Sequence, residues 1–175
     1  MKKLLILCLL LVSGWSLVGC SNSSTTASVS NSDYLRVHIR ANSNSEEDQS
    51  VKYYVKDVVV VYLSKYMKNC KTKQQAIDVL EEKSDDIKKI VNGALEEKGY
   101  FYGCNIGIKN EFFPTKAYGD LVLEADYYDA LIINLGTGEG QNWWCVMYPN
   151  ICFNEPTNVV YKSKIKEIIR KIKGE

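Results

Sequence analysis

The sequence predicts a single α+β domain, in which an antiparallel-leaning sheet has two amphipathic helices packed on one face. Strand-like alternation of apolar and polar residues occurs before and after a central region with helical periodicity. The chain has 175 residues, and 46% of them are apolar, which suffices for one ordinary core and not for two. The formal net charge is +1, and we expect no nucleic-acid partner.

The first twenty residues have the pattern of an export signal. Lys2 and Lys3 precede an apolar run over 4–12, as in a secretory signal peptide. This run is shorter than the roughly 20 residues that a membrane-spanning helix needs. Residues 17–20, Leu-Val-Gly-Cys, resemble a bacterial lipobox. We therefore expect acylation at Cys20 and membrane anchoring, with simple cleavage of the signal as the alternative.

The domain is expected to begin after a polar tether. Residues 21–33 are rich in Ser, Thr and Asn, and they have too little apolar surface to order themselves. Residues 34–40 then alternate between apolar and charged or histidine side chains, which is the pattern of a half-buried strand. On this pattern Arg36, His38 and Arg40 point away from the core.

A polar turn at 42–45 leads into the first predicted helix. Asp48 follows Ser45 by three residues, which indicates a capping-box-like start. Apolar side chains then recur at spacings of three and four, so we predict a helix over 46–68. The four valines of 58–61 favour a strand locally, but the longer periodicity outweighs them.

A second amphipathic helix is predicted between Thr72 and Gly99. Thr72 and Gln75 have capping-box spacing, and Gly99 is a suitable residue to end the helix. A strand over 100–108 and a stronger apolar strand over 127–135 follow. The first helix and this second one are expected to cover the same face of the sheet.

The glycine- and tryptophan-rich stretch 136–152 is the most unusual part of the chain. Alternation over 143–148 predicts a strand that places its two tryptophans on opposite faces. The Pro-Asn turn that follows brings Cys152 opposite Cys145. A disulfide between them closes a loop of about eight residues and stabilises the fold by roughly 2.5 kcal/mol.

Cys145 has two interpretations. In one it is a thiol nucleophile paired with His38, the single histidine of the chain. In the other it forms a disulfide with Cys152. Export favours oxidation, and an even set of four cysteines remains once Cys8 is removed and Cys20 is acylated. We favour the disulfide and keep a small exported thiol enzyme, acting on cell wall or peptide, as the alternative.

The four cysteines contain no CxxC pair, so a zinc site is a weaker interpretation still. We expect no metal and no cofactor.

The last segment, 156–175, predicts a basic amphipathic helix. Its isoleucines form one stripe, and residues 159–175 contain six basic and two acidic side chains. In one interpretation the basic face contacts anionic lipid or an acidic partner. In the other the isoleucines pack on the domain itself and the charges are solvated. The main domain is therefore expected to span 34–155.

The two tryptophans also suggest an interaction surface. Because they face opposite sides of one strand, one can fill the core while the other is exposed or lies under a loop. An exposed tryptophan beside a rigid turn is typical of interface hot spots. The polar turn at 42–45 is expected to share this surface if the Gly-rich loop packs near it. The candidate partner-binding residues are His38, Arg40, Asn42, Asp48, Gln49, Asn142, Trp143 and Trp144.

Three separated motifs point to a family. They are LRVHIRANSNSEEDQ at 35–49, FPTKAYGD at 113–120, and GQNWWCVMYP at 140–149 followed by Cys152 and Phe153. In this order they closely resemble stage II sporulation protein R of endospore-forming bacteria, over about residues 34–153.

The resemblance implies an exported, non-enzymatic signalling protein. Such a protein would be made in the forespore under sigma F and would cross the forespore membrane to the intermembrane space. There it would activate a mother-cell membrane protease of the aspartic type, which processes the precursor of sigma E.

Overall fold

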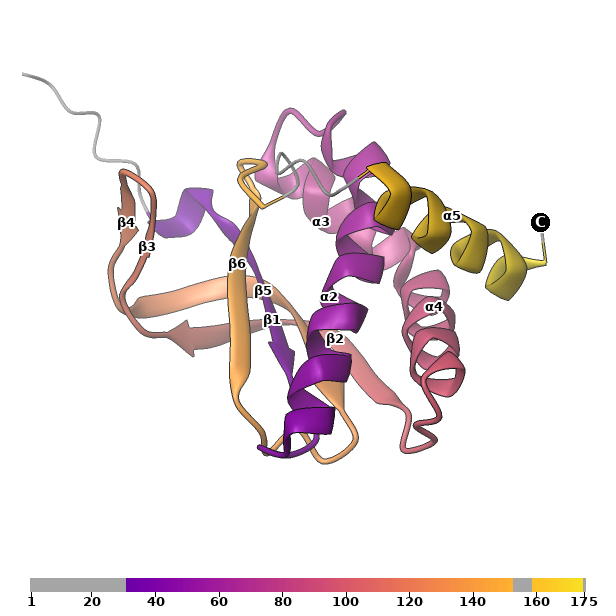
Figure 1. The fold of residues 1–175 in the computed structure, drawn as a ribbon. Helices are drawn as coiled ribbons and strands as arrows, with labels where there is room; N and C mark the ends of the chain where they lie inside the picture. The colour runs from indigo at the N-terminus through magenta and orange to yellow at the C-terminus, as the bar shows by residue number, and fades with distance from the viewer. Residues whose placement is uncertain (1–30, 153–158, 175) are drawn as a thin grey trace, which may run out of the picture.

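The computed structural model describes residues 31–152 and 159–174. A four-stranded sheet in the order β2-β5-β1-β6 forms its centre, with helices packed on one face and a small hairpin beside the other (Figure 1). The α+β class is confirmed. The strands of the sheet are β1 (Leu35–Arg40), β2 (Cys104–Phe113), β5 (Asp126–Leu135) and β6 (Asn142–Tyr148).

The sheet is mixed rather than antiparallel throughout. β1 is antiparallel to β6 and β5 is antiparallel to β2, but the central pair, β1 and β5, is parallel. A parallel pair needs a long crossover between its strands. Here the crossover includes the helices between residues 46 and 97, β2 and the hairpin at 116–123. The antiparallel leaning is thus confirmed at both outer pairs and absent at the centre.

The helical layer contains more helices than predicted. The first predicted helix is confirmed as α2, but the second is two helices that meet at Lys83, where the backbone leaves the helical conformation. Ser84, Asp85 and Asp86 begin the new helix, and such residues are favoured in a first turn. The helices are α2 (Glu46–Met67), α3 (Lys73–Glu82), α4 (Ser84–Glu97) and α5 (Val159–Lys173).

The predicted helix ends are confirmed by their hydrogen bonds. Ser45 Oγ accepts from the backbone N–H of Asp48 at 3.1 Å, and Thr72 Oγ1 accepts from that of Gln75 at 3.1 Å. Gly99 follows α4 with a positive φ of 82°, the left-handed conformation that glycine adopts most readily. The strand predicted from residue 100 begins later, at Cys104.

The sheet is buried on both faces. Its helical face forms the main core, while the opposite face packs a second apolar cluster that includes Phe113, Tyr128 and Val146. The hairpin of β3 (Lys116–Tyr118) and β4 (Leu121–Leu123) contributes to this second cluster. As a result, the prediction of a half-buried first strand is wrong.

α5 packs on its own domain. Ile165, Ile169 and Ile172 lie in or against the main core, and α5 contacts α2 and α4. A Cβ at Gly93 of α4 would come within 2.8 Å of Ile172, so the glycine permits this close approach. The interpretation in which the isoleucines pack on the domain is confirmed.

Several predicted features lie outside the described residues. They are the signal segment 1–20 with Cys20, the tether up to residue 30, and the Pro-Thr-Asn start at 156–158. Among the helices within the described ranges, none is long and apolar enough to cross a membrane.

Candidate functional site

The polar turn at 42–45 packs directly against the Gly-rich loop at 136–141, and we name this contact the turn–loop node. Thr137 donates from its backbone N–H to Asn42 Oδ1 at 3.0 Å and from Oγ1 to the Asn42 carbonyl at 2.8 Å. Gln141 N donates to Asn44 Oδ1 at 2.7 Å. Two motifs that are nearly 100 residues apart in sequence therefore form one surface, as the sequence suggested.

Glycine is required where the turn and loop are closest. A Cβ at Gly140 would overlap the carbonyl oxygen of Ser43 and crowd the Ala41 side chain. The Gly140 N–H donates to the Ala41 carbonyl at 2.8 Å. Backbone contacts of this kind fix the loop without relying on long, flexible side chains.

Asp48 is a buried hydrogen-bond acceptor that stabilises the node. Its side chain is only 6% exposed. Oδ2 accepts from Asn42 Nδ2 at 2.9 Å and Ser43 Oγ at 2.6 Å, and Oδ1 accepts from Tyr102 Oη at 2.9 Å. Burial raises the pKa of Asp48, but these hydrogen bonds outweigh it, so the pKa lies below its ordinary value. The reciprocal capping contact predicted for Asp48 is absent, because Ser45 N donates to Ser43 Oγ instead.

Gln49 and Lys52 extend the node along α2. Gln49 Nε2 donates to the Ser43 carbonyl at 2.8 Å, and Lys52 Nζ donates to Gln49 Oε1 at 2.6 Å and to the Gln141 carbonyl at 3.1 Å. Lys52 is 1% exposed, and burial lowers its pKa. Its ammonium also lies 4.6 Å from the ring centroid of Tyr53, which is 51% exposed. Tyr53 thus places an exposed aromatic ring beside the node.

His38 lies on the hairpin side of the sheet, but it is buried. Its exposed fraction is 3%, so the predicted outward, accessible position is wrong. Nδ1 hydrogen-bonds Glu111 Oε1 at 2.8 Å, and Glu111 also forms an ion pair with Arg40. Burial lowers the pKa of His38, the contacts with Asn142 and Glu111 oppose this, and the positive charge of Arg40 adds to it. The pKa of His38 therefore lies below its ordinary value.

Asn142, Trp143 and Trp144 are all half-buried. The tryptophans do face opposite sides, as predicted, because Trp143 packs against the main core and Trp144 against the second cluster. Lys56 Nζ lies 6.0 Å from the Trp143 ring centroid and Lys116 Nζ lies 4.5 Å from that of Trp144. Both tryptophans are therefore partly covered and partly accessible.

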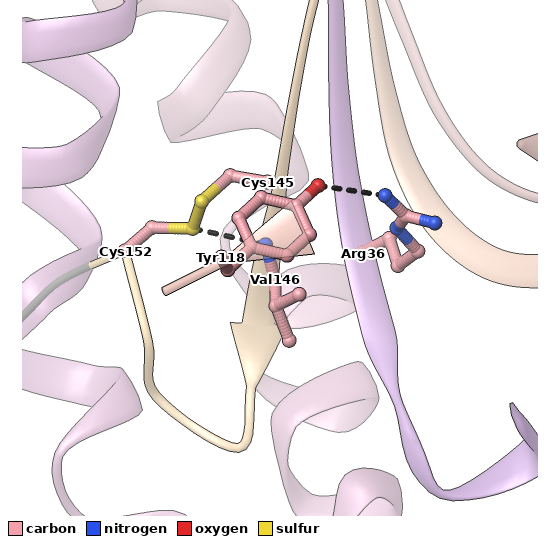
Figure 2. Close-up of a disulfide and its surroundings, with 5 residues drawn as sticks. All are labelled: Arg36, Tyr118, Cys145, Val146 and Cys152. Atoms are coloured by element: carbon pink, nitrogen blue, oxygen red, sulfur yellow. Dashed lines mark hydrogen bonds between the residues drawn. A yellow bond between two sulfur atoms is a disulfide. The ribbon is translucent and has the colours of Figure 1, made fainter. Parts of the chain in front are cut away.

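Cys145 and Cys152 form the predicted disulfide, with Cα atoms 6.2 Å apart. The Val146 N–H donates to Cys152 Sγ at 2.9 Å (Figure 2). The Cys152 N–H donates back to the Val146 carbonyl at 3.3 Å. Cys145 faces the helical core, whereas His38 faces the hairpin. The thiol–imidazole pair of the alternative interpretation is therefore not formed.

Arg36 is a buried charge that sequence reasoning placed on the outside. It is 0% exposed, Nη2 donates to Tyr118 Oη at 2.7 Å (Figure 2), and its guanidinium lies 4.2 Å from the Phe113 ring centroid. Such cation–π contacts are favourable when desolvated. The hairpin is thus fixed to β1 through Tyr118.

Three other residues of the site, Glu111, Tyr102 and Tyr53, were not predicted from the sequence. Glu111 and Tyr102 lie on β2 or just before it, and only the folded sheet brings them to His38 and Asp48. Tyr53 has the signal of an exposed position on an amphipathic helix. Within the described ranges, no group of three or more His, Cys, Asp or Glu residues is placed to hold a metal ion.

Comparisons with known proteins agree with the three motifs. The family model for stage II sporulation protein R matches residues 31–158. Stage II sporulation protein R of Bacillus subtilis (strain 168) is 34% identical over 182 aligned residues, which cover 98% of this chain and 81% of that protein. No solved structure matches the chain. Because the family model covers most of the chain and the relative matches nearly all of it, the protein belongs to the stage II sporulation protein R family.

Proposed function

We propose that this protein is an exported, non-enzymatic signal that activates the mother-cell membrane protease of the aspartic type, which processes the precursor of sigma E. Family membership supports a role in sporulation. The proposed partner is the part of that protease which faces the intermembrane space. The protein acts by binding, and the catalytic groups belong to the protease.

The turn–loop node is the observation that favours a binding role. Polar groups around it are held by hydrogen bonds to buried Asp48 and Lys52, so little conformational entropy is lost when a partner binds. Tyr53 supplies an exposed aromatic ring, and the Lys52 ammonium beneath it also contacts the carbonyl of exposed Gln141. An aromatic anchor within a polar rim is a common arrangement at protein interfaces.

The predicted binding residues divide into two groups. Asp48 and His38 are buried and act from within, by positioning the node and the neighbouring strand. The partly accessible residues form the surface itself. They are Arg40, Asn42, Gln49, Asn142, Trp143 and Trp144, to which we add exposed Tyr53 and Gln141.

Precursor cleavage in cells that co-express the protease tests this proposal. We expect a Tyr53→Ala, Gln141→Ala double variant to lose cleavage, with a binding loss of roughly 1 to 4 kcal/mol for a hot-spot residue. Tyr127→Ala is a matched control for the tyrosine. Tyr127 is also exposed, but it lies at the start of β5, whereas the node follows the end of that strand. Circular dichroism of each purified domain checks the fold. Full cleavage with the folded double variant would refute the surface assignment.

A thiol enzyme is not favoured. Cys145 is in a disulfide, and His38 lies across the sheet from it. Cys70 and Cys104 are free, but burial raises the pKa of both thiols, that of Cys104 to about 11. Thiols with raised pKa values are poor nucleophiles near neutral pH.

We also propose that the protein is anchored to the membrane at Cys20. The lipobox-like sequence at 17–20 is the support for this. Lipoprotein processing adds more than one acyl chain, and two chains anchor a protein stably. Intact-mass measurement of the protein from native membranes is the test. A mature protein that starts at another residue, without lipid, would contradict it.

A further inference from the structure

β6 is an edge strand of the sheet, because its only ladder partner among the described strands is β1. In a strand, the backbone N–H and C=O groups of successive residues point alternately to the two sides. At the start of β6, Ala41 N donates to the Gln141 carbonyl, so Gln141 faces β1. Trp143 and Cys145 therefore face β1 as well, opposite Ile39 and Val37.

By the same alternation Asn142, Trp144 and Val146 face outward, and the disulfide loop occupies the backbone groups of Val146. Both the N–H and the C=O of Val146 are bonded to Cys152, which places these groups on the side away from β1. The same alternation directs the backbone groups of Asn142 and Trp144 outward. We name residues 142–144 the open edge. The loop closed by the disulfide limits the open edge to these residues.

We propose that the open edge of β6 pairs with an extended, acidic segment of the partner, which adds a strand to the sheet. This inference rests on the proposed function and specifies how the partner binds. Strand addition supplies affinity through backbone hydrogen bonds, and flanking side chains supply specificity. The side chains of Asn142 and Trp144 lie on the hairpin face of the sheet, and that of Trp143 lies on the helical face.

Charge favours an acidic segment rather than a second copy of this chain. Lys116 lies over Trp144 and forms no ion pair within the described part of the chain. A carboxylate opposite the open edge would provide its counter-charge. In an antiparallel pairing of two β6 strands, the Lys116 side chains of both copies would approach each other, and like charges across strands are destabilising.

Amide hydrogen exchange, with and without proteoliposomes that contain the protease, tests the pairing. In the free protein the amides of Asn142 and Trp144 should exchange faster than those of Trp143 and Cys145, which face β1. Binding should then protect Asn142 and Trp144 in particular. Protection elsewhere without protection at the open edge would overturn this inference and leave the proposed function intact. No protection anywhere would count against the proposed function itself.

Two variants of Asn142 separate the contribution of its backbone N–H to binding from that of its side chain. Asn142→Pro removes the outward N–H, and proline is tolerated where a strand N–H faces away from its neighbour. It should bind roughly five- to tenfold more weakly than Asn142→Ala, with an unchanged melting temperature relative to Asn142→Ala. Equal binding of the two variants would overturn the pairing.

The charge argument is tested in the same assay. Lys116→Glu should weaken binding more than Lys109→Glu, an exposed lysine on the strand at the opposite edge of the sheet. Equal effects would remove the argument for an acidic segment. If the purified protein instead self-associates through the open edge, Asn142→Pro would abolish the association. That result would show that a second copy of the chain, and not an acidic segment, pairs with the open edge, and it would overturn the proposal.

Discussion

Replacing Asp48 with Asn should uncouple the polar turn from the Gly-rich loop. The carboxylate accepts three side-chain hydrogen bonds, from Asn42, Ser43 and Tyr102. An asparagine keeps one acceptor oxygen, so at least one donor loses its partner and faces an NH₂ group. Hydrogen bonds to a charged group contribute about 1.5–3 kcal/mol each, and a buried donor left without a partner adds a desolvation cost. We therefore expect Asp48→Asn to lower the free energy of unfolding by about 3–5 kcal/mol.

The same carboxylate predicts a dependence on pH. The pKa of Asp48 is lower in the folded protein, so its stabilising contribution is complete above the ordinary value of about 3.9 and is lost as the pH falls through the lowered value. Wild-type stability should decline in that acidic range. Asp48→Asn should lack this part of the decline, because an amide does not titrate.

Urea denaturation near neutral pH and in the acidic range measures both effects. Tyr102→Phe removes one of the three donors and should cost about 1–2 kcal/mol. Glu47→Gln is the control, since it removes an exposed charge from the same helical turn and should cost no more than about 1 kcal/mol. A loss below about 1 kcal/mol for Asp48→Asn would show that the carboxylate does not organise the node.

Three further predictions follow from the site. Cys145→Ser and Cys152→Ser should lower the free energy of unfolding to a similar extent, by roughly 2.5 kcal/mol in thermal or urea unfolding. Both should also reduce protease activation equally. Loss of activation with Cys145→Ser but not with Cys152→Ser would instead support Cys145 as a nucleophile. Because burial lowers the pKa of His38, the unfolded chain binds a proton first, so stability should fall as the pH drops below about 6.5, and His38→Gln should remove that slope in urea titrations at several pH values. Gly140→Ala should displace the loop, since its Cβ would overlap a backbone carbonyl; a melting temperature and a cleavage activity equal to wild type would contradict the close packing.

Local chemistry in the sequence determined much of the fold. The first strand, the helix from Glu46 and the strand ending at Leu135 match their predicted ranges within about one residue, because alternation, helical periodicity and capping residues act over short distances. The disulfide was also predictable, since a tight turn brings two nearby cysteines together. The family motifs indicated the right family because each motif is a contiguous stretch that can be recognised without the fold.

Only the tertiary structure decided which polar residues are accessible. Alternation in the first strand indicates two faces, but it does not reveal that the β3–β4 hairpin covers the second one and buries Arg36 and His38. Similarly, no local pattern pairs Glu111 with His38 or Tyr102 with Asp48, because these contacts join segments more than 50 residues apart. Burial and long-range partners depend on how distant segments pack, so they emerge only when the whole chain is folded.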